Sequence, residues 1–390
     1  MESDVITRIR KAIRDEGVDG WLFYNFRHRD RLADEILGLD PGSTSSRPWV
    51  YAVPAEASCQ RIVHAIEKDI LNSLPGNTTV YSGRETFMAA LEALGGHRWG
   101  VHVSEILPII SFLDAGSAAL MEKAGLILVP ADSLVQRLKG LLDQNEVDSH
   151  ERAAAGLYDL VEKTWARVQA AWRSGKQIRE GDIRAFMLGG MKALGLTTDH
   201  PPIVASGANA GNPHYDFSGD GAVLEPGAIV QLDLWAKENK PDSIYADISW
   251  VGVFAEHAKA AEERTFADLI AARDLAVAFI SRELEQGRRP TGSAVDAEVR
   301  KSLISAGYTS ALRHRTGHGI DTECHGSGVN IDSVEFPDTR LLLDGACFSI
   351  EPGLYFDDFG LRTEIDVYIQ NGKARVSGAT PQRTFLDCQR

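Results

Sequence analysis

Short apolar runs alternate with stretches of helical periodicity over about the first 140 residues of the chain. The runs are rich in the β-branched and aromatic residues that strands favour, and they lie at residues 21–24, 49–53, 79–82, 99–103 and 126–130. Between them, residues 84–94 and 112–124 have helical spacing, and residues 1–17 form an amphipathic pattern that ends at a glycine. This alternation predicts an α/β domain.

The pattern changes at residues 143–172, where apolar side chains recur every three or four positions with charged residues between them. These apolar positions are Val147, Ala154, Leu157, Val161, Trp165 and Val168. The spacing predicts one long amphipathic helix, which opens a second domain. Further helices are predicted at residues 180–194 and roughly at 258–286 and 293–306, among strands bounded by Pro-Gly or Asp-Gly turns.

A weak internal repeat is the most informative feature of the second domain. Leu224–Asp233 and Leu342–Glu351 each contain a turn glycine followed by alanine, then a strand that ends on an acid six residues past the glycine. Each segment is followed by a second strand in which an acid precedes isoleucine, at Asp247 and at Glu364. The first and second acids are 14 residues apart in one copy and 13 in the other.

Strand geometry gives this repeat a chemical meaning. Side chains alternate between the faces of a strand, so all four acids fall on the more polar face of their strands. Two such hairpins facing each other would bring four carboxylates together, and like charges in a shared site destabilise the fold unless cations neutralise them. The alternative is that each acid lies on a solvated sheet face, but the duplication favours a metal site.

Three histidines lie in one glycine-rich segment, RHRTGHGIDTECHG, at His314, His318 and His325. Glycines on both sides of His318 are expected to let the backbone approach a ligand closely, and neutral imidazole is a natural nitrogen ligand for a metal. His214 lies apart in a loop flanked by Pro and Gly. Cys324, next to His325, is either a functional thiol or, as the sequence favours, a small residue filling the core.

Composition narrows the classes of function. The formal net charge of −14 and the absence of a Lys/Arg run argue against a nucleic-acid partner. Four scattered cysteines without a CxxC pair argue against a thiolate zinc site and a disulfide framework, so a reducing cytoplasm is the expected compartment. The chain shows neither the apolar stretch of a signal peptide nor a run long enough to span a membrane.

About 240 C-terminal residues resemble the pita-bread metallopeptidases, which include methionine aminopeptidase, aminopeptidase P and prolidase. The resemblance rests on the strings QLDLWA, YADIS, TGHGI, SIEPGLY and LRTEID. It implies an α+β fold, in which a smaller α/β domain at residues 1–141 precedes a pita-bread catalytic domain of pseudo-twofold halves at 142–390. The additional N-terminal domain points to the proline-specific branch.

The resemblance also implies roles for individual residues. The metal ligands would be Asp233, Asp247, His318, Glu351 and Glu364. Asp247 and Glu364 would bridge two ions, Asp233 would complete one of them, and His318 with Glu351 the other. His214 and His325 would contact the substrate and the scissile carbonyl, with Glu351 as general base, and His314 and Arg362 match substrate-binding residues of the proline-specific branch. Two divalent ions are expected, with manganese favoured and cobalt, zinc or iron as alternatives.

The predicted function is therefore hydrolysis of Xaa-Pro dipeptides by a homodimeric cytoplasmic enzyme. Aminopeptidase P, a metal-free enzyme resembling creatinase and a catalytically silent binding protein are the alternatives. The intact ligand set argues against the last two. Trp235, Trp250 and Gly326 depart from the family strings, and these departures concern substrate choice more than chemistry.

Overall fold

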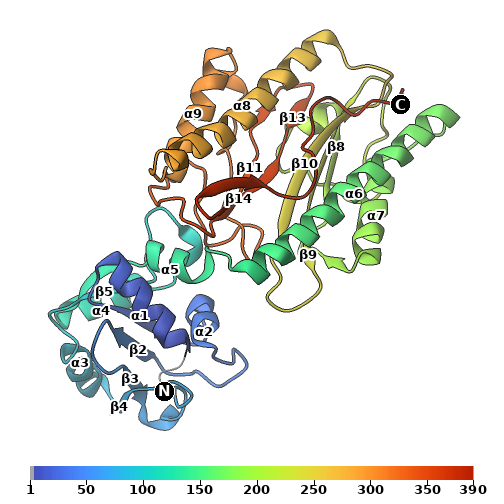
Figure 1. The fold of residues 1–390 in the computed structure, drawn as a ribbon. Helices are drawn as coiled ribbons and strands as arrows, with labels where there is room; N and C mark the ends of the chain where they lie inside the picture. Colours follow the sequence, from blue (N-terminus) through green and yellow to red (C-terminus); the bar gives the residue numbers. More distant parts are fainter. Residues whose placement is uncertain (1–3, 390) are drawn as a thin grey trace. The chain divides into compact units, whose positions relative to one another are not determined.

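The computed structural model describes residues 4–389 and divides into two compact units between Lys139 and Gly140. Each unit is built around its own β-structure and its own apolar cores (Figure 1).

The first unit is built on a six-stranded mixed sheet. Its strands run in the order β4 (Asn77–Tyr81), β3 (Gln60–His64), β2 (Trp49–Pro54), β1 (Gly20–Asn25), β5 (Arg98–Val101) and β6 (Ile127–Pro130). Its helices are α1 (Asp4–Glu16), α2 (Arg31–Leu37), α3 (Arg84–Glu92), α4 (Ala115–Lys123) and α5 (Asp132–Lys139). The cores on the two sides of the sheet explain the continuous apolar runs, since Trp21 and Phe23 pack into one and Leu22 into the other.

The second unit contains two halves, each a small sheet covered by two helices. The first half has β7 (Leu196–Thr197), β8 (Ile203–Ser206), β9 (Ile229–Glu238) and β10 (Ala246–Val253), packed against α6 (Gln144–Ser174) and α7 (Glu180–Ala193). The second has β11 (Cys347–Ile350), β14 (Ile365–Gln370) and β15 (Lys373–Val376), packed against α8 (Ala260–Glu285) and α9 (Gly292–Ser305). The short strands β12 (Gly353–Tyr355) and β13 (Gly360–Arg362) form a separate hairpin. Figure 1 shows the two helix pairs on opposite sides of the strands.

The long helix α6 follows the predicted pattern closely. All six predicted apolar positions are buried. Asp143 caps its first turn by accepting hydrogen bonds from the backbone of Asn145 and Glu146, and Glu146 caps back onto Asp143. Gly175, with a φ of 63°, ends the helix in the left-handed conformation.

The structure confirms the predicted α+β class and most of the predicted elements. In the first unit, strand β3 and helices α2 and α5 were missed, and in the second unit the short strands β7, β8, β12 and β15 were missed. All four cysteines are buried and unpaired. Within residues 4–389, no helix has the length and apolarity needed to cross a membrane.

Candidate metal centre

Two antiparallel hairpins carry the four acids of the internal repeat. In the first, β9 pairs with β10 so that Asp233 lies opposite Ser249. In the second, β11 pairs with β14; Glu351 directly follows β11, and Glu364 directly precedes β14. The hairpins meet where the Glu364 backbone N–H donates to the Ser249 carbonyl at 3.2 Å. The acids of both halves therefore converge on one point.

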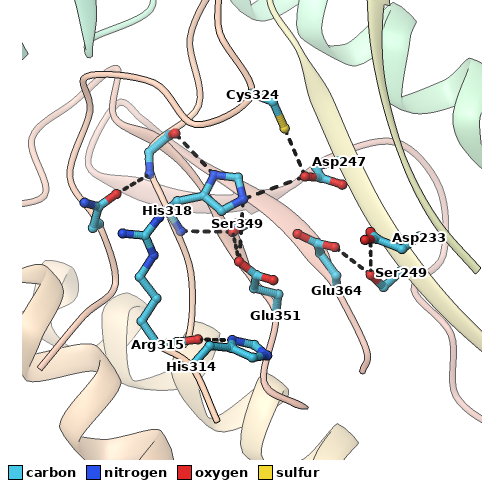
Figure 2. Close-up of polar contacts among 12 residues, drawn as sticks. Asp233, Asp247, Ser249, His314, Arg315, His318, Cys324, Ser349, Glu351 and Glu364 are labelled. Atoms are coloured by element: carbon cyan, nitrogen blue, oxygen red, sulfur yellow. Dashed lines mark hydrogen bonds and ion pairs between the residues drawn. The ribbon is translucent and has the colours of Figure 1, made fainter. Parts of the chain in front are cut away.

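All five predicted ligands meet there (Figure 2). One trio is formed by Asp233, Asp247 and Glu364, and another by His318, Glu351 and Glu364. Within each trio the possible ligand atoms lie within 4.8 Å of one another. Glu364 belongs to both trios, which is the arrangement that a bridging carboxylate requires.

Burial makes this concentration of acids costly without cations. Asp247 and Glu364 are only 5% and 2% exposed. Burial and then the neighbouring acids, Asp233 for Asp247 and Asp247 for Glu364, raise the pKa of both carboxyls well above its usual range. Asp247 Oδ1 and Glu364 Oε1 accept no hydrogen bond from any residue that the structure describes. Buried carboxylate oxygens without partners, in an oxygen-rich set with one imidazole, fit divalent cations.

His318 completes the set as a neutral nitrogen ligand. Burial, followed by the charge of His325, holds its pKa well below the ordinary value. Its Nε2 atom lies 3.7 Å from Asp247 Oδ2 and 3.5 Å from Glu351 Oε1. These separations are too long for good hydrogen bonds, but they suit ligands that converge on one ion.

Glycine is required on both sides of His318 because two backbone segments cross closely there, and not only to admit a ligand as predicted. A Cβ atom on Gly317 would lie 2.0 Å from the Ser349 carbonyl oxygen, and one on Gly319 would lie 2.5 Å from the Gly328 backbone. The prediction that they admit a ligand was therefore incomplete, because they let backbone segments cross closely. The crossing fixes His318 through a hydrogen bond from its N–H to Ser349 Oγ at 3.0 Å.

Arg362 and Ser249 orient the carboxylates of Asp233 and Glu364 through an ion pair and hydrogen bonds. The Arg362 guanidinium pairs with Asp233 Oδ2 and donates from Nε to Ser249 Oγ at 3.0 Å. The Ser249 hydroxyl in turn lies 2.9 Å from Asp233 Oδ1 and 2.8 Å from Glu364 Oε2, and it can donate its single hydrogen to only one of them at a time. Arg362 thus forms its ion pair with Asp233, which lies far from it in the sequence, rather than with the nearby acids Glu364 and Asp366.

His314 is engaged by the protein. Its Nδ1 lies 2.6 Å from the Arg315 carbonyl and so carries the hydrogen, which leaves Nε2 to accept from the Tyr355 hydroxyl at 2.8 Å. Burial, followed by the charge of Arg362, lowers the pKa of His314 to about 3. Arg362 Nη1 also donates to Tyr355 at 3.3 Å, so Tyr355 links the two predicted substrate residues.

The two histidines expected at the scissile carbonyl are both exposed in part. The ring centroid of His325 lies 4.2 Å from that of His318, and desolvation by the surrounding atoms, followed by the charge of Arg315, lowers the pKa of His325 to about 4. His214 is exposed in the loop before β9. Its charge contributes to lowering the pKa of both His314 and His325, so it lies on their side of the site.

Sequence reasoning missed several residues that shape the site. Ser249 and Asp366 stand two residues after Asp247 and Glu364, on the same strand faces, and the period of two could have identified them. The Asp366 carboxylate accepts the Asp247 backbone N–H at 2.7 Å. Burial raises the pKa of Glu351, and the charge of Arg315 offsets part of that rise, a role that nothing in its local pattern signalled.

The three departures from the family strings are accommodated by local packing. Trp235 donates from Nε1 to Asp199 at 2.7 Å, and Trp250 packs edge-on against Tyr158 in the core under α6. A side chain at Gly326 would meet the Asp321 carboxyl at 2.5 Å. None of the three is a member of a metal-ligand trio.

Comparison with known proteins places this geometry in context. The model of metallopeptidase family M24 matches residues 149–371. A probable dipeptidase PepE of Mycobacterium tuberculosis is 26% identical over 303 residues, which cover 76% of this chain and 72% of that protein. A Xaa-Pro dipeptidase of Lactobacillus delbrueckii subsp. lactis is 30% identical over 176 residues, 43% of this chain and 42% of that protein. The solved structure of dipeptidase PepE from Mycobacterium ulcerans superposes with a TM-score of 0.72 at 21% identity, over 99% of this chain and 100% of that one, and shows the same fold.

Proposed function

Because the chain belongs to metallopeptidase family M24 and is a hydrolase of that family, we propose that it cleaves the peptide bond before proline in Xaa-Pro dipeptides with two divalent ions. The observation that carries the proposal is the convergence of five ligand side chains, four of them buried, in which two carboxylate oxygens have no hydrogen-bond partner among residues 4–389. The Xaa-Pro dipeptidase among the relatives supports the substrate class. The oxygen-rich ligand set favours manganese. A cytoplasmic location is proposed from the four scattered cysteines, and a homodimer from the resemblance alone.

The chemistry divides between bound ions and side chains. When bound, divalent ions supply Lewis-acid catalysis and lower the pKa of water toward neutral. Burial raises the pKa of Glu351 to about 7, which suits a carboxylate that accepts a proton near neutral pH and returns it to the leaving amine. His325 is kept neutral and offers one ring N–H to the developing oxyanion.

The remaining residues position the substrate. The prolyl nitrogen of the scissile bond has no N–H, so recognition depends on shape and on groups flanking the bond. We assign His214 to contact the substrate from its exposed loop. Arg362 and His314 are both hydrogen-bonded to the Tyr355 hydroxyl, which fixes the orientation of their side chains. A substrate carboxylate would reach Arg362 by replacing its 3.3 Å hydrogen bond to the Pro213 carbonyl.

A peptide panel tests the substrate assignment. The metal-loaded protein is assayed with Gly-Pro, Ala-Pro, Leu-Pro and an Xaa-Pro-Xaa tripeptide. Cleavage of the dipeptides alone is the expected result, whereas cleavage of the tripeptide as well makes the protein an aminopeptidase P. In the same panel, Arg362→Ala should lose more activity on dipeptides than on longer peptides, and an equal loss on both would remove the carboxylate role.

A further inference from the structure

Cys324 lies at the edge of the metal centre and has no role in the function proposed so far. Its side chain is buried, and its Sγ–H donates to Asp247 Oδ2 at 3.0 Å. Figure 2 shows the sulfur pointing toward Asp247, on the side of the centre where His318 lies. The prediction that Cys324 only fills the core was therefore incomplete, because its sulfur faces a predicted bridging carboxylate.

Cys324 forms a third trio with two of the proposed ligands. The possible ligand atoms of Cys324, Asp247 and His318 lie within 4.8 Å of one another, the same limit that the two trios of the proposed centre satisfy. Zinc is bound by sulfur at about 2.3 Å and by carboxylate oxygen at about 2.1 Å, so a sulfur and an oxygen 3.0 Å apart can reach one ion together. Independently, Asp247 Oδ1 is buried and has no hydrogen-bond partner in the described part of the chain, so the carboxylate can bridge two ions.

We propose that Cys324 is a sixth protein ligand and gives sulfur to the ion held by His318 and Asp247. This inference rests on the proposed two-metal function and refines it. The two ion positions then differ in chemistry, because the trio of Asp233, Asp247 and Glu364 is all oxygen. Sulfur selects zinc, iron(II) or cobalt(II) at the His318 position, whereas the oxygen-only position keeps its preference for manganese. On binding, the sulfur gives its proton to solvent and donates an electron pair to the ion.

The competing interpretation is that the thiol only orients Asp247 by donating a hydrogen bond to it. Both roles would affect activity, so activity cannot separate them. Direct sulfur–metal bonding can be detected spectroscopically, because cobalt(II) bound to thiolate shows a sulfur-to-cobalt charge-transfer absorption in the near ultraviolet, and cobalt(II) bound by oxygen and nitrogen alone lacks it.

The test titrates the chelated, full-length protein with cobalt(II) chloride while absorption and bound stoichiometry are measured. The charge-transfer band is expected in the wild type and in Cys59→Ser, a matched control in the other unit, but not in Cys324→Ser or Cys324→Ala. A zinc–manganese competition dialysis should show the preference for zinc falling about tenfold or more in the Cys324 variants.

The possible results distinguish failure of sulfur ligation from failure of the two-metal function. Two bound cobalt ions without the band in the wild type, or a band that persists in the Cys324 variants, would overturn sulfur ligation and leave the two-metal function intact. Failure of the wild type to bind cobalt would remove both proposals. The wild-type spectrum is decisive even if the variants fold poorly.

Discussion

Gly317→Ala probes how the backbone crossing positions the metal-binding histidine. The added Cβ would lie 2.0 Å from the Ser349 carbonyl oxygen, whereas ordinary contact begins at 3.4 Å. The two segments must therefore separate by roughly 1.4 Å, and overpacking of this kind costs roughly 1–3 kcal/mol. Ser349 also donates its backbone N–H to the His318 carbonyl at 2.9 Å, so the separation moves His318 away from Glu351.

The expected result is a loss of stability accompanied by a larger loss of function. A ligand misplaced by about 1 Å reduces activity on the order of a hundredfold, and metal affinity should fall with it. Denaturant unfolding of the metal-free variant measures stability, and calorimetric metal titration measures affinity. Gly189→Ala is the matched control, because its Cβ meets nothing within 4 Å in α7 and should stabilise the helix by up to about 1 kcal/mol. Unchanged stability and metal affinity in Gly317→Ala would show that the backbone crossing does not position His318.

Three further substitutions test other parts of the account. Burial and then Asp247 raise the pKa of Glu364, so the charged form of this carboxyl is disfavoured in the metal-free protein and Glu364→Gln should cost little metal-free stability. The substitution should abolish the rise in melting temperature on adding manganese, and a large loss of metal-free stability would contradict this. Burial lowers the pKa of His314 to about 3 in the folded protein, whereas an unfolded histidine titrates near about 6.5. As pH falls from about 6.5 toward 3, only the unfolded state binds the proton, so the free energy of unfolding should fall by about 1.4 kcal/mol per pH unit. The difference in unfolding free energy between the metal-free wild type and His314→Gln, followed across this range, should show that slope, and a flat difference would count against it. Glu180 is fully buried and accepts five hydrogen bonds from Ser206, Asn209, Tyr215 and Ala222, which anchor the loop carrying His214. Glu180→Gln should lower the free energy of unfolding by about 1–3 kcal/mol and raise KM more than it lowers kcat. An equal effect on KM and kcat would argue for a purely structural role.

Local periodicity was sufficient where one side of an element faces a core. The apolar spacing of residues 143–172 predicted α6 to within two residues at each end, because helix period and burial coincide there. The strand period also identified the polar faces that carry the acids. In contrast, β3 begins with Gln60 and Arg61, which are only half-buried, so its pattern was too weak to predict a strand.

The contacts that define the site were less predictable because they join distant parts of the chain. The pair between Arg362 and Asp233 spans 129 residues, and the contact between Cys324 and Asp247 spans 77. Neither leaves a local signal, since each depends on how the two halves meet. The ligand residues themselves were predictable only because the internal repeat and the family strings marked them.

Ala-Pro hydrolysis by the chelated protein, followed as metal is added back in known equivalents, tests two-metal catalysis directly. No activity is expected without metal, and activity should rise as manganese or cobalt occupies the site and saturate at two bound equivalents. Activity that survives complete chelation, or no cleavage with two ions bound, would contradict these expectations.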